Sequence, residues 1–397
     1  MVELARRGAA VIFISSDFEE IAGMCDRAAV MHRGKINTIL PREELSAEKL
    51  LFWASGSALS AESGDTTSAA LPDVPEATIN PARSSRAHWG TVIGMILVLA
   101  AISFIAPDFL RFANIFDVLK QGSVLAFIAL GLTVILIAGG FDMSAGAVSQ
   151  LTTNLAAGTL TAGMGSLAAI AIGGATGILA GCANAALVLL FGMPPFVATL
   201  GTMFVAMGAT LLYNNGKALT LYNQPDFFYI GQGYIGPVPF VFIILVVVTL
   251  GLHVILRKTK LGLRMYAVGQ NLVAAQLRGI RHRPYALASF ALGGLILGLA
   301  GVVLASYSYG ASALATGIDF LISALAAAFL GSTLSRAGDL NVIGTVVVAI
   351  FLASLSNGLI LIGISGQALP AIQGIVLIIS VALGVIRKRN IGQVLIF

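Results

Sequence analysis

Long apolar segments separated by short polar loops fill the chain from Trp89 onward, and this pattern predicts transmembrane helices. A helix needs about 20 apolar residues to cross a bilayer. The segments that fit are residues 89–106, 121–138, 145–162, 167–190, 194–213, 238–256, 285–309, 320–335, 342–363 and 369–386. We therefore expect an all-α polytopic membrane protein with about ten transmembrane helices, in a transmembrane domain that covers residues 89–390.

Glycine spacing inside these segments predicts close helix packing. Gly173–Ala186 and Gly293–Gly301 carry glycines at intervals that let helix backbones approach one another in a membrane. The stretch from Met143 to Gly216 contains no Lys, Arg, Asp or Glu, so its helix boundaries rest on glycine and proline alone. We expect a densely packed bundle.

The N-terminal residues 1–54 have a different pattern, which predicts a short α/β fragment. Ala9–Ser15 is typical of a buried strand, and Asp17 is expected to cap a helix that follows it. Two further strands, Ala28–His32 and Lys35–Leu40, flank a turn at 33–34. So few residues bury too little surface to make a strong independent domain.

Residues 55–88 are rich in Ser, Ala, Pro and Thr, which predicts a flexible linker.

The net charge of the chain changes sign at the end of this segment. Residues 1–88 hold 12 acidic and nine basic residues (net −3), whereas residues 89–397 hold six and 14 (net +8). The whole chain is 57% hydrophobic and 10% charged, against about a quarter charged in soluble domains. Basic residues on membrane loops mark the cytoplasmic side, so the charge does not indicate a nucleic-acid partner.

The segment Arg257–Pro284 lies between two predicted spans and holds seven of the 23 Lys and Arg residues and no acid. With the N-terminus inside, six spans place this basic loop in the cytoplasm. Four more spans place the C-terminus and its basic run 387–389 there as well. Within the loop, Asn271 is expected to cap a short helix, Leu272–Arg278, that ends at Gly279 in a left-handed conformation.

Polar residues within or beside the spans are candidates for a translocation path. They are Asp142, Ser144, Asn154, Thr199, Thr202, Asn357 and Gln373, and Asn184 is a further uncharged polar residue in a span. Each has a structural alternative. Asp142 or Ser144 as a helix cap is favoured over a path role, because Gly139 and Gly140 indicate a helix end. The threonines can bond their own helix, and the amides can join neighbouring helices.

Catalytic and metal chemistry find no support in the sequence. His32, His88, His253 and His282 are scattered without ligand spacing, and we see no nucleophile with a matching base. Cys25 and Cys182 do not suggest a disulfide framework. We expect a protein that is not an enzyme and holds no metal.

The segment ISSDFEEIAGMCDRAAVMHRGKI, residues 14–36, resembles the tail of a sugar-importer ATPase of the ABC superfamily. Ser16 matches the position of the switch residue after the last core strand. The fragment 1–54 contains no GxxxxGK[ST] phosphate-binding loop, so it cannot hydrolyse ATP alone. We interpret it as a remnant from a gene fusion, a truncated longer chain or a misplaced start. ATP would bind a partner subunit, and this chain would hold no cofactor.

Four stretches in order resemble the permeases of ribose, xylose and simple-sugar ABC importers. They are GGFDMSAGAV (139–148), NAALVLLFGMPPFVATLGTM (184–203), TKLGLRMYAVGQNLVAAQLRGI (259–280) and GSTLSRAG…IGT (331–345). The resemblance covers about residues 90–388. It departs from many relatives at Ser323, where they have an acid, and at Gly331-Ser332, where they have two glycines.

This resemblance implies a complex of two permease subunits and two ATPase subunits, fed by a periplasmic sugar-binding protein, in the bacterial inner membrane. It also implies that the coupling motif that docks on the ATPase is Gly269, Asn271, Ala274, Ala275 and Gly279. The expected function is ATP-driven import of a small sugar or polyol, coupled through residues 257–284. The alternatives are an ion-coupled secondary transporter, for which Asp142 is the best candidate group, and an inactive fusion product.

Overall fold

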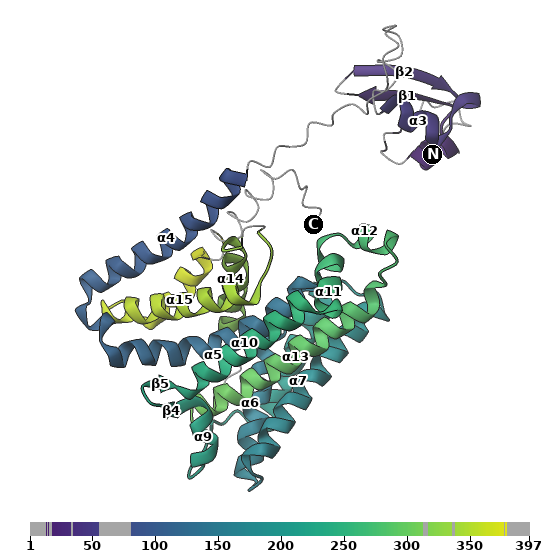
Figure 1. The fold of residues 1–397 in the computed structure, drawn as a ribbon. Helices are drawn as coiled ribbons and strands as arrows, with labels where there is room; N and C mark the ends of the chain where they lie inside the picture. Colours follow the sequence, from purple (N-terminus) through teal and green to yellow (C-terminus); the bar gives the residue numbers. More distant parts are fainter. Residues whose placement is uncertain are drawn as a thin grey trace. The chain divides into compact units, whose positions relative to one another are not determined.

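The computed structural model describes residues 18–32, 35–54, 81–312, 317–335 and 338–376, with residues 13, 15 and 378 (Figure 1). The chain forms two compact units, Met1–Glu76 and Ala77–Phe397. The predicted strand 9–15, apart from residues 13 and 15, lies outside the described residues. So do Ser16, Asp17, the turn at 33–34, most of the predicted linker and the basic run 387–389.

The first unit is built on a β-hairpin. Its elements are α2 (Phe18–Met24), β1 (Arg27–His32), β2 (Lys35–Pro41), the 3₁₀ helix η1 (Arg42–Glu44) and α3 (Ala47–Ala54). β1 and β2 pair antiparallel where the two strands are expected. Side chains alternate between the faces of a strand, so Ala28, Val30 and Leu40 are buried against Leu50 of α3.

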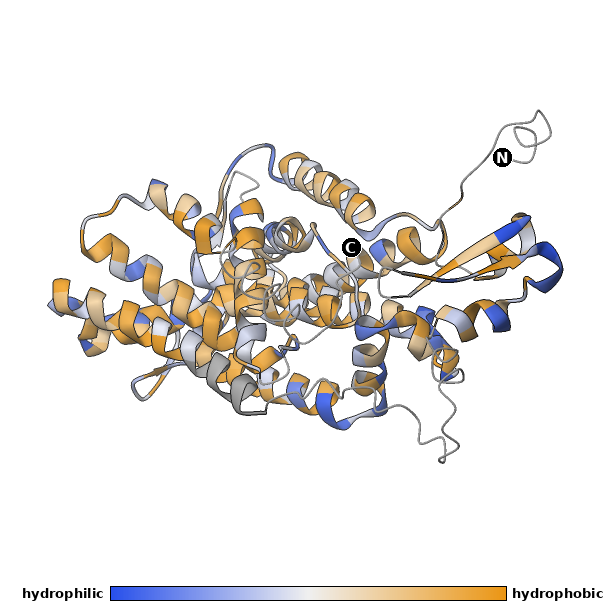
Figure 2. Ribbon diagram, turned by 90° about the horizontal axis from the view of Figure 1, so that it is seen from above, coloured by the Kyte–Doolittle hydropathy of each residue, from blue (hydrophilic) through white to orange (hydrophobic). Residues whose placement is uncertain are grey.

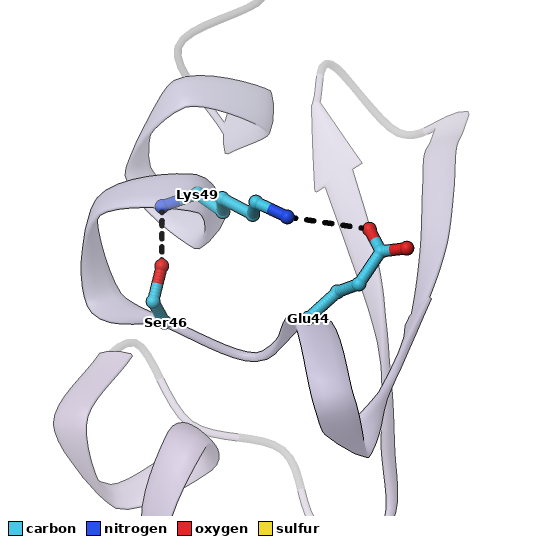
Figure 3. A network of polar contacts seen from close by, with 3 residues as sticks. All are labelled: Glu44, Ser46 and Lys49. Atoms are coloured by element: carbon cyan, nitrogen blue, oxygen red, sulfur yellow. Dashed lines mark hydrogen bonds and ion pairs between the residues drawn. The ribbon is translucent and has the colours of Figure 1, made fainter.

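Helix α3 begins with a small polar network (Figure 3). The hydroxyl of Ser46 accepts a hydrogen bond from the Lys49 backbone N–H at 3.2 Å, which is the bond that a capping serine makes. The Lys49 ammonium also lies 3.5 Å from a Glu44 carboxylate oxygen. This ion pair is exposed, so the cap contributes more to the start of α3 than the charges do.

The second unit is almost entirely helical. Its long elements are α4 (Pro81–Ile105), α5 (Phe112–Ile137), α6 (Ala145–Thr161), α7 (Ser166–Leu189), α8 (Pro195–Asn214), α10 (Phe240–Lys258), α11 (Lys260–Gln270), α13 (His282–Tyr307), α14 (Gly317–Thr333) and α15 (Val342–Leu361). Its short elements are η3 (Pro107–Leu110), β3 (Leu219–Thr220), α9 (Pro225–Gln232), β4 (Tyr234–Ile235), β5 (Val238–Pro239), α12 (Leu272–Leu277), β6 (Gly310–Ala311) and η4 (Gly366–Ala368).

Six helices of the described segments are long and apolar enough to cross a membrane, namely α5, α7, α8, α10, α13 and α15. Shorter apolar helices are Gly90–Ile105 and α14. Most residues of these helices are hydrophobic (Figure 2). The chain is therefore a polytopic helical membrane protein. The predicted tenth span, 369–386, extends beyond the described residues.

Helix α4 begins at Pro81, inside the segment 55–88 that the sequence assigns to a linker. Proline suits the first turn of a helix, because its missing N–H would have no partner there. The helical part of this unit therefore starts eight residues before Trp89, the expected beginning of the first span (89 − 81 = 8).

Helices α7 and α13 pack along each other at close range (Figure 1). A Cβ added at Gly177 would lie 2.1 Å from the carbonyl oxygen of Gly294, and one at Gly298 would lie 2.2 Å from that of Gly173. Only glycine allows such backbone contact. The predicted close packing of both glycine-rich segments is confirmed. α5, the most buried of the six long helices, packs against both α13 and α15.

Candidate functional site

Between α10 and α13, the basic loop forms two successive helices, α11 and α12, which meet at Asn271 and are called the α11–α12 hairpin below. Asn271 caps α12, and its side-chain oxygen accepts a hydrogen bond from the Ala274 N–H at 2.9 Å. At the other end, Gly279 has φ +76°, and its N–H donates to the Gln276 carbonyl at 2.8 Å. The predicted capped helix and its left-handed glycine are confirmed. The helix ends at Leu277, one residue earlier than expected.

Helix α12 presents apolar side chains outward. Leu277 is 85% exposed and Val273 66%, and Leu272 is exposed as well. Of the predicted coupling residues, Gly269, Asn271, Ala274 and Gly279 are exposed, whereas Ala275 is buried. A short helix with this much exposed apolar surface at its tip offers a binding surface for another protein.

Basic residues lie beside this surface. A hollow beside α12 is lined by Gln276, Gly279 and the run Ile280–Pro284, which includes two arginines and a histidine. The ion pairs found within the described ranges are Lys49–Glu44, Arg111–Asp108 and Lys120–Asp117, and none of them involves the loop. The arginines near α12 thus remain available for acidic groups of a partner.

Helix α11 anchors this hairpin on the bundle. Tyr266 donates a hydrogen bond from its hydroxyl to the Leu340 carbonyl at 2.8 Å, and the Arg257 guanidinium lies 4.5 Å from the centre of the Tyr266 ring. Gln270 donates to Asp339 at 3.2 Å. We did not predict α11 from the sequence. Its signal is the i, i+3, i+4 spacing of the buried residues Gly262, Met265 and Tyr266, with basic residues interspersed among them.

The second predicted region surrounds Asp142, in the turn between α5 and α6. The Asp142 carboxylate is buried and accepts hydrogen bonds from the backbone N–H and hydroxyl of Ser144, at 2.7 and 2.5 Å. Asn184 of α7 donates to the Ser144 hydroxyl at 3.0 Å and lies 3.5 Å from Asp142. Burial raises the pKa of the Asp142 carboxyl, and the bonds from Ser144 act in the opposite direction.

The predicted cap at this turn has a different form. Ser144 is the N-cap residue of α6, but its hydroxyl makes no capping bond and donates to Asp142 instead. Asp142 bonds the N–H two residues on, which is an Asx turn before the helix. Both side chains therefore fix the turn, and neither bonds the first turn of α6.

Thr199, at the start of α8, joins the same region. Its buried hydroxyl accepts a hydrogen bond from the Met143 N–H at 3.0 Å and donates to the Pro195 carbonyl at 2.8 Å. Thr202 donates to the Ala198 carbonyl at 3.2 Å, a bond inside its own helix. Asp142, Ser144 and Thr199 thus come together, with Asn184 as a fourth member.

The remaining predicted path residues lie in three other places. Asn154 accepts a hydrogen bond from Asn214 at 3.0 Å, and Asn357 accepts one from Asn114 at 3.0 Å. Each amide pair joins two helices, which is the structural alternative that the sequence offered to a role in the path. Gln373 accepts from Ser323 at 2.7 Å and lies 3.5 Å from the Ser356 hydroxyl. The sequence did not identify these partners, because each pair joins segments far apart in the chain.

In the part of the chain that the structure describes, no group of three or more His, Cys, Asp or Glu residues could hold a metal ion. The polar clusters above consist mainly of hydroxyls and amides. Such groups bind neutral, hydroxyl-bearing molecules or join helices.

Comparison with known proteins gives a consistent result. Residues 114–381 match the family described as "Branched-chain amino acid transport system / permease component". The chain is 35% identical over 302 residues to the ribose import permease protein of Bacillus subtilis, which covers 76% of this chain and 93% of that protein. It is 31% identical over 294 residues to the ribose import permease protein of Escherichia coli K12, which covers 73% and 91%.

The galactofuranose transporter permease protein of Escherichia coli K12 is 30% identical over 320 residues, or 78% of this chain and 92% of that protein. No solved structure matches the chain significantly. The family match covers more than half of the chain and includes the Asp142 turn, the α11–α12 hairpin and most of the bundle. The chain therefore belongs to the family of branched-chain amino acid transport system permease components, and it is a transporter permease subunit rather than an enzyme.

Proposed function

We propose that this chain is the membrane subunit of an ATP-driven importer for a small sugar or polyol, and that α12 is the contact through which an ATPase subunit drives it. The observation that carries the proposal is the surface of α12. Leu277, Val273 and Leu272 are exposed on a helix whose two ends are fixed by Asn271 and Gly279. A groove on an ATPase would bury these side chains, and acidic residues at its rim would face the arginines.

The substrate class follows from the relatives and from the chemistry of the bundle. The similar proteins are named for ribose and galactofuranose, and another, from Bifidobacterium longum, is named for fructose. The Ser323, Ser356 and Gln373 side chains form an uncharged polar cluster. Hydroxyls and amides suit the alcohol groups of a sugar better than they suit the apolar side chain of a branched amino acid.

The proposed complex holds two copies of this permease, two ATPase subunits that bind the ATP, and a periplasmic sugar-binding protein. α8 leaves Phe204, Val205 and Leu212 exposed at 62%, 70% and 81%. This apolar face suits either lipid or the second permease. In the proposed topology ten helices span the bacterial inner membrane and both termini lie in the cytoplasm, which keeps the basic loop inside.

For residues 1–54 we propose an α/β remnant of an ATPase tail. Its core contains few side chains, and Met31, Ile36 and Ile39 on the other face of the hairpin are 60%, 58% and 58% exposed. A face of this kind suits a piece that once packed against a larger domain. Deleting residues 1–76, which leaves α4 intact, tests the alternative of an inactive fusion. Gain of uptake would support that alternative, and unchanged uptake would show that the segment is inert.

Transport itself is tested in proteoliposomes that hold the purified chain together with its cognate ATPase and sugar-binding protein. Uptake of labelled ribose, fructose and galactose is measured with and without ATP, and with and without the ATPase. We expect uptake of at least one sugar that requires both. Uptake that persists without the ATPase would replace this proposal by an ion-coupled secondary transporter, with Asp142 as the group to test.

A further inference from the structure

The backbone of α11 lies in direct contact with the backbone at the end of α5. A Cβ added at Gly269 would lie 2.1 Å from the Ile137 carbonyl oxygen and 2.8 Å from the Gly139 nitrogen. Gly139 has φ +80°, a conformation that glycine adopts without strain. No side chain therefore separates the hairpin from the turn that leaves α5, and a shift of α11 cannot be absorbed by side-chain rotation.

The same turn is held at its other end by α7 and α8. Asn184 of α7 donates to the Ser144 hydroxyl, which in turn donates to Asp142. Thr199 of α8 accepts from the Met143 N–H. Asp142, Ser144, Asn184 and Thr199 are all at most 2% exposed, so these bonds are shielded from water. The turn 139–144 thus connects the hairpin on one side to two helices on the other.

One atom of this network lacks a partner. Among the described residues, the side-chain oxygen of Asn184 is buried and makes no hydrogen bond. An unpaired buried acceptor is unfavourable, and the contact between Asn184 and the turn would be more stable if this oxygen had a hydrogen-bond donor. Asn184 therefore contacts the turn through its amide nitrogen alone.

We propose that the turn 139–144 is a mechanical relay: α11 pushes on it at Gly269, and Asn184 and Thr199 carry the displacement to α7 and the start of α8. Asn184 is a positioning residue in this relay. The inference rests on the proposed function, since it assigns to the ATPase-driven hairpin a route into the bundle. A second connection runs from Tyr266 and Gln270 to residues 339–340, before α15, so the test must separate the two routes.

The first test needs no substrate or partner. Amide hydrogen exchange is measured on the purified chain in detergent for Gly269→Ala and for Gly251→Ala. The added methyl meets backbone in the first case, whereas no atom lies within 4 Å of it in the second. We expect exchange in peptides covering 138–144 and 195–203 to rise about twofold or more for Gly269→Ala only. A change confined to residues around 137–139 and 269, or one that reaches only 339–345, would overturn the relay.

The second test does not depend on whether Gly269→Ala folds. The substitution Asn184→Asp places two carboxylates side by side, and the double variant Asp142→Asn with Asn184→Asp restores one carboxylate and one amide. We expect the single variant to lower the number of ribose molecules imported per ATP by about fivefold or more, and the double variant to recover most of it. A normal ratio in the folded single variant, or no recovery in the folded double variant, would overturn the relay. If the parent shows no ATP-dependent uptake, the proposed function fails, and the exchange experiment still decides the relay.

Discussion

Asn271 and Ala274 define the start of α12: the Asn271 side-chain oxygen accepts the Ala274 backbone N–H at 2.9 Å. Without this bond the first turn of a six-residue helix has no side-chain cap. The helix is too short to be stable by itself, so its caps and its neighbours determine whether it forms.

Replacing Asn271 by Ala is therefore expected to destabilise α12 locally by about 1 kcal/mol and to reduce ATP-dependent uptake. Asn271→Ser and Asn271→Asp, which keep an acceptor, should retain more activity. Uptake and ATPase stimulation in proteoliposomes measure the effect. Equal loss in all three variants would show that the amide itself contacts a partner and that capping is not its role.

At the other end of α12, Gly279 is expected to be intolerant of proline. Proline fixes φ near −65°, whereas Gly279 has φ +76° and donates its N–H to the Gln276 carbonyl. We expect Gly279→Pro to abolish ATPase stimulation and uptake while the bundle stays folded, as measured by thermal unfolding. Gly163→Pro is the matched control, because Gly163 has φ +80° after α6, at the other end of the helices. Loss of coupling in the control would assign the effect to general strain.

Leu277 tests the docking surface without altering the fold. At 85% exposed, it makes few contacts inside the chain, so Leu277→Asp should leave the melting temperature unchanged. Burial of a leucine side chain contributes about 1.5–3 kcal/mol, and its loss should weaken ATPase binding by about tenfold or more. Binding of the purified ATPase measures this. The control is Leu167→Asp, at a residue that is 81% exposed at the start of α7, and this variant should bind the ATPase as tightly as the parent does.

How far the sequence predicts this molecule depends on the distance between interacting residues. The Asn271 cap and the Gly279 turn involve neighbours within a few residues, and the sequence located both. The contact of Asn184 with Asp142 spans 42 positions, and the sequence offered each residue only as a separate polar group. A glycine pattern predicts close packing, but it does not say that Gly269 meets the end of α5.

A substitution at Gln373 tests whether this residue contacts the transported sugar or only joins neighbouring helices. Its side chain lies between Ser323 of α14 and Ser356 of α15 and is only half buried. If it contacts the sugar, Gln373→Ala should raise the ribose concentration for half-maximal uptake by about tenfold, the effect of losing a good hydrogen bond. ATPase binding should not change. Thr202→Val, which removes a bond inside α8, is the control. An unchanged half-maximal concentration with lower thermal stability would assign Gln373 to packing.

The α7–α13 contact leads to a prediction about stability. Gly177→Ala would force a methyl to within 2.1 Å of the Gly294 carbonyl oxygen, so the two helices must separate. Overpacking of this kind costs about 1–3 kcal/mol, and we expect a lower melting temperature in detergent. Gly208→Ala is the matched control in α8, where the added methyl meets no atom within 4 Å. Because alanine favours a helix over glycine, this variant should be neutral or slightly more stable. Equal melting of the two variants would mean that α7 and α13 do not pack at this distance in the membrane protein.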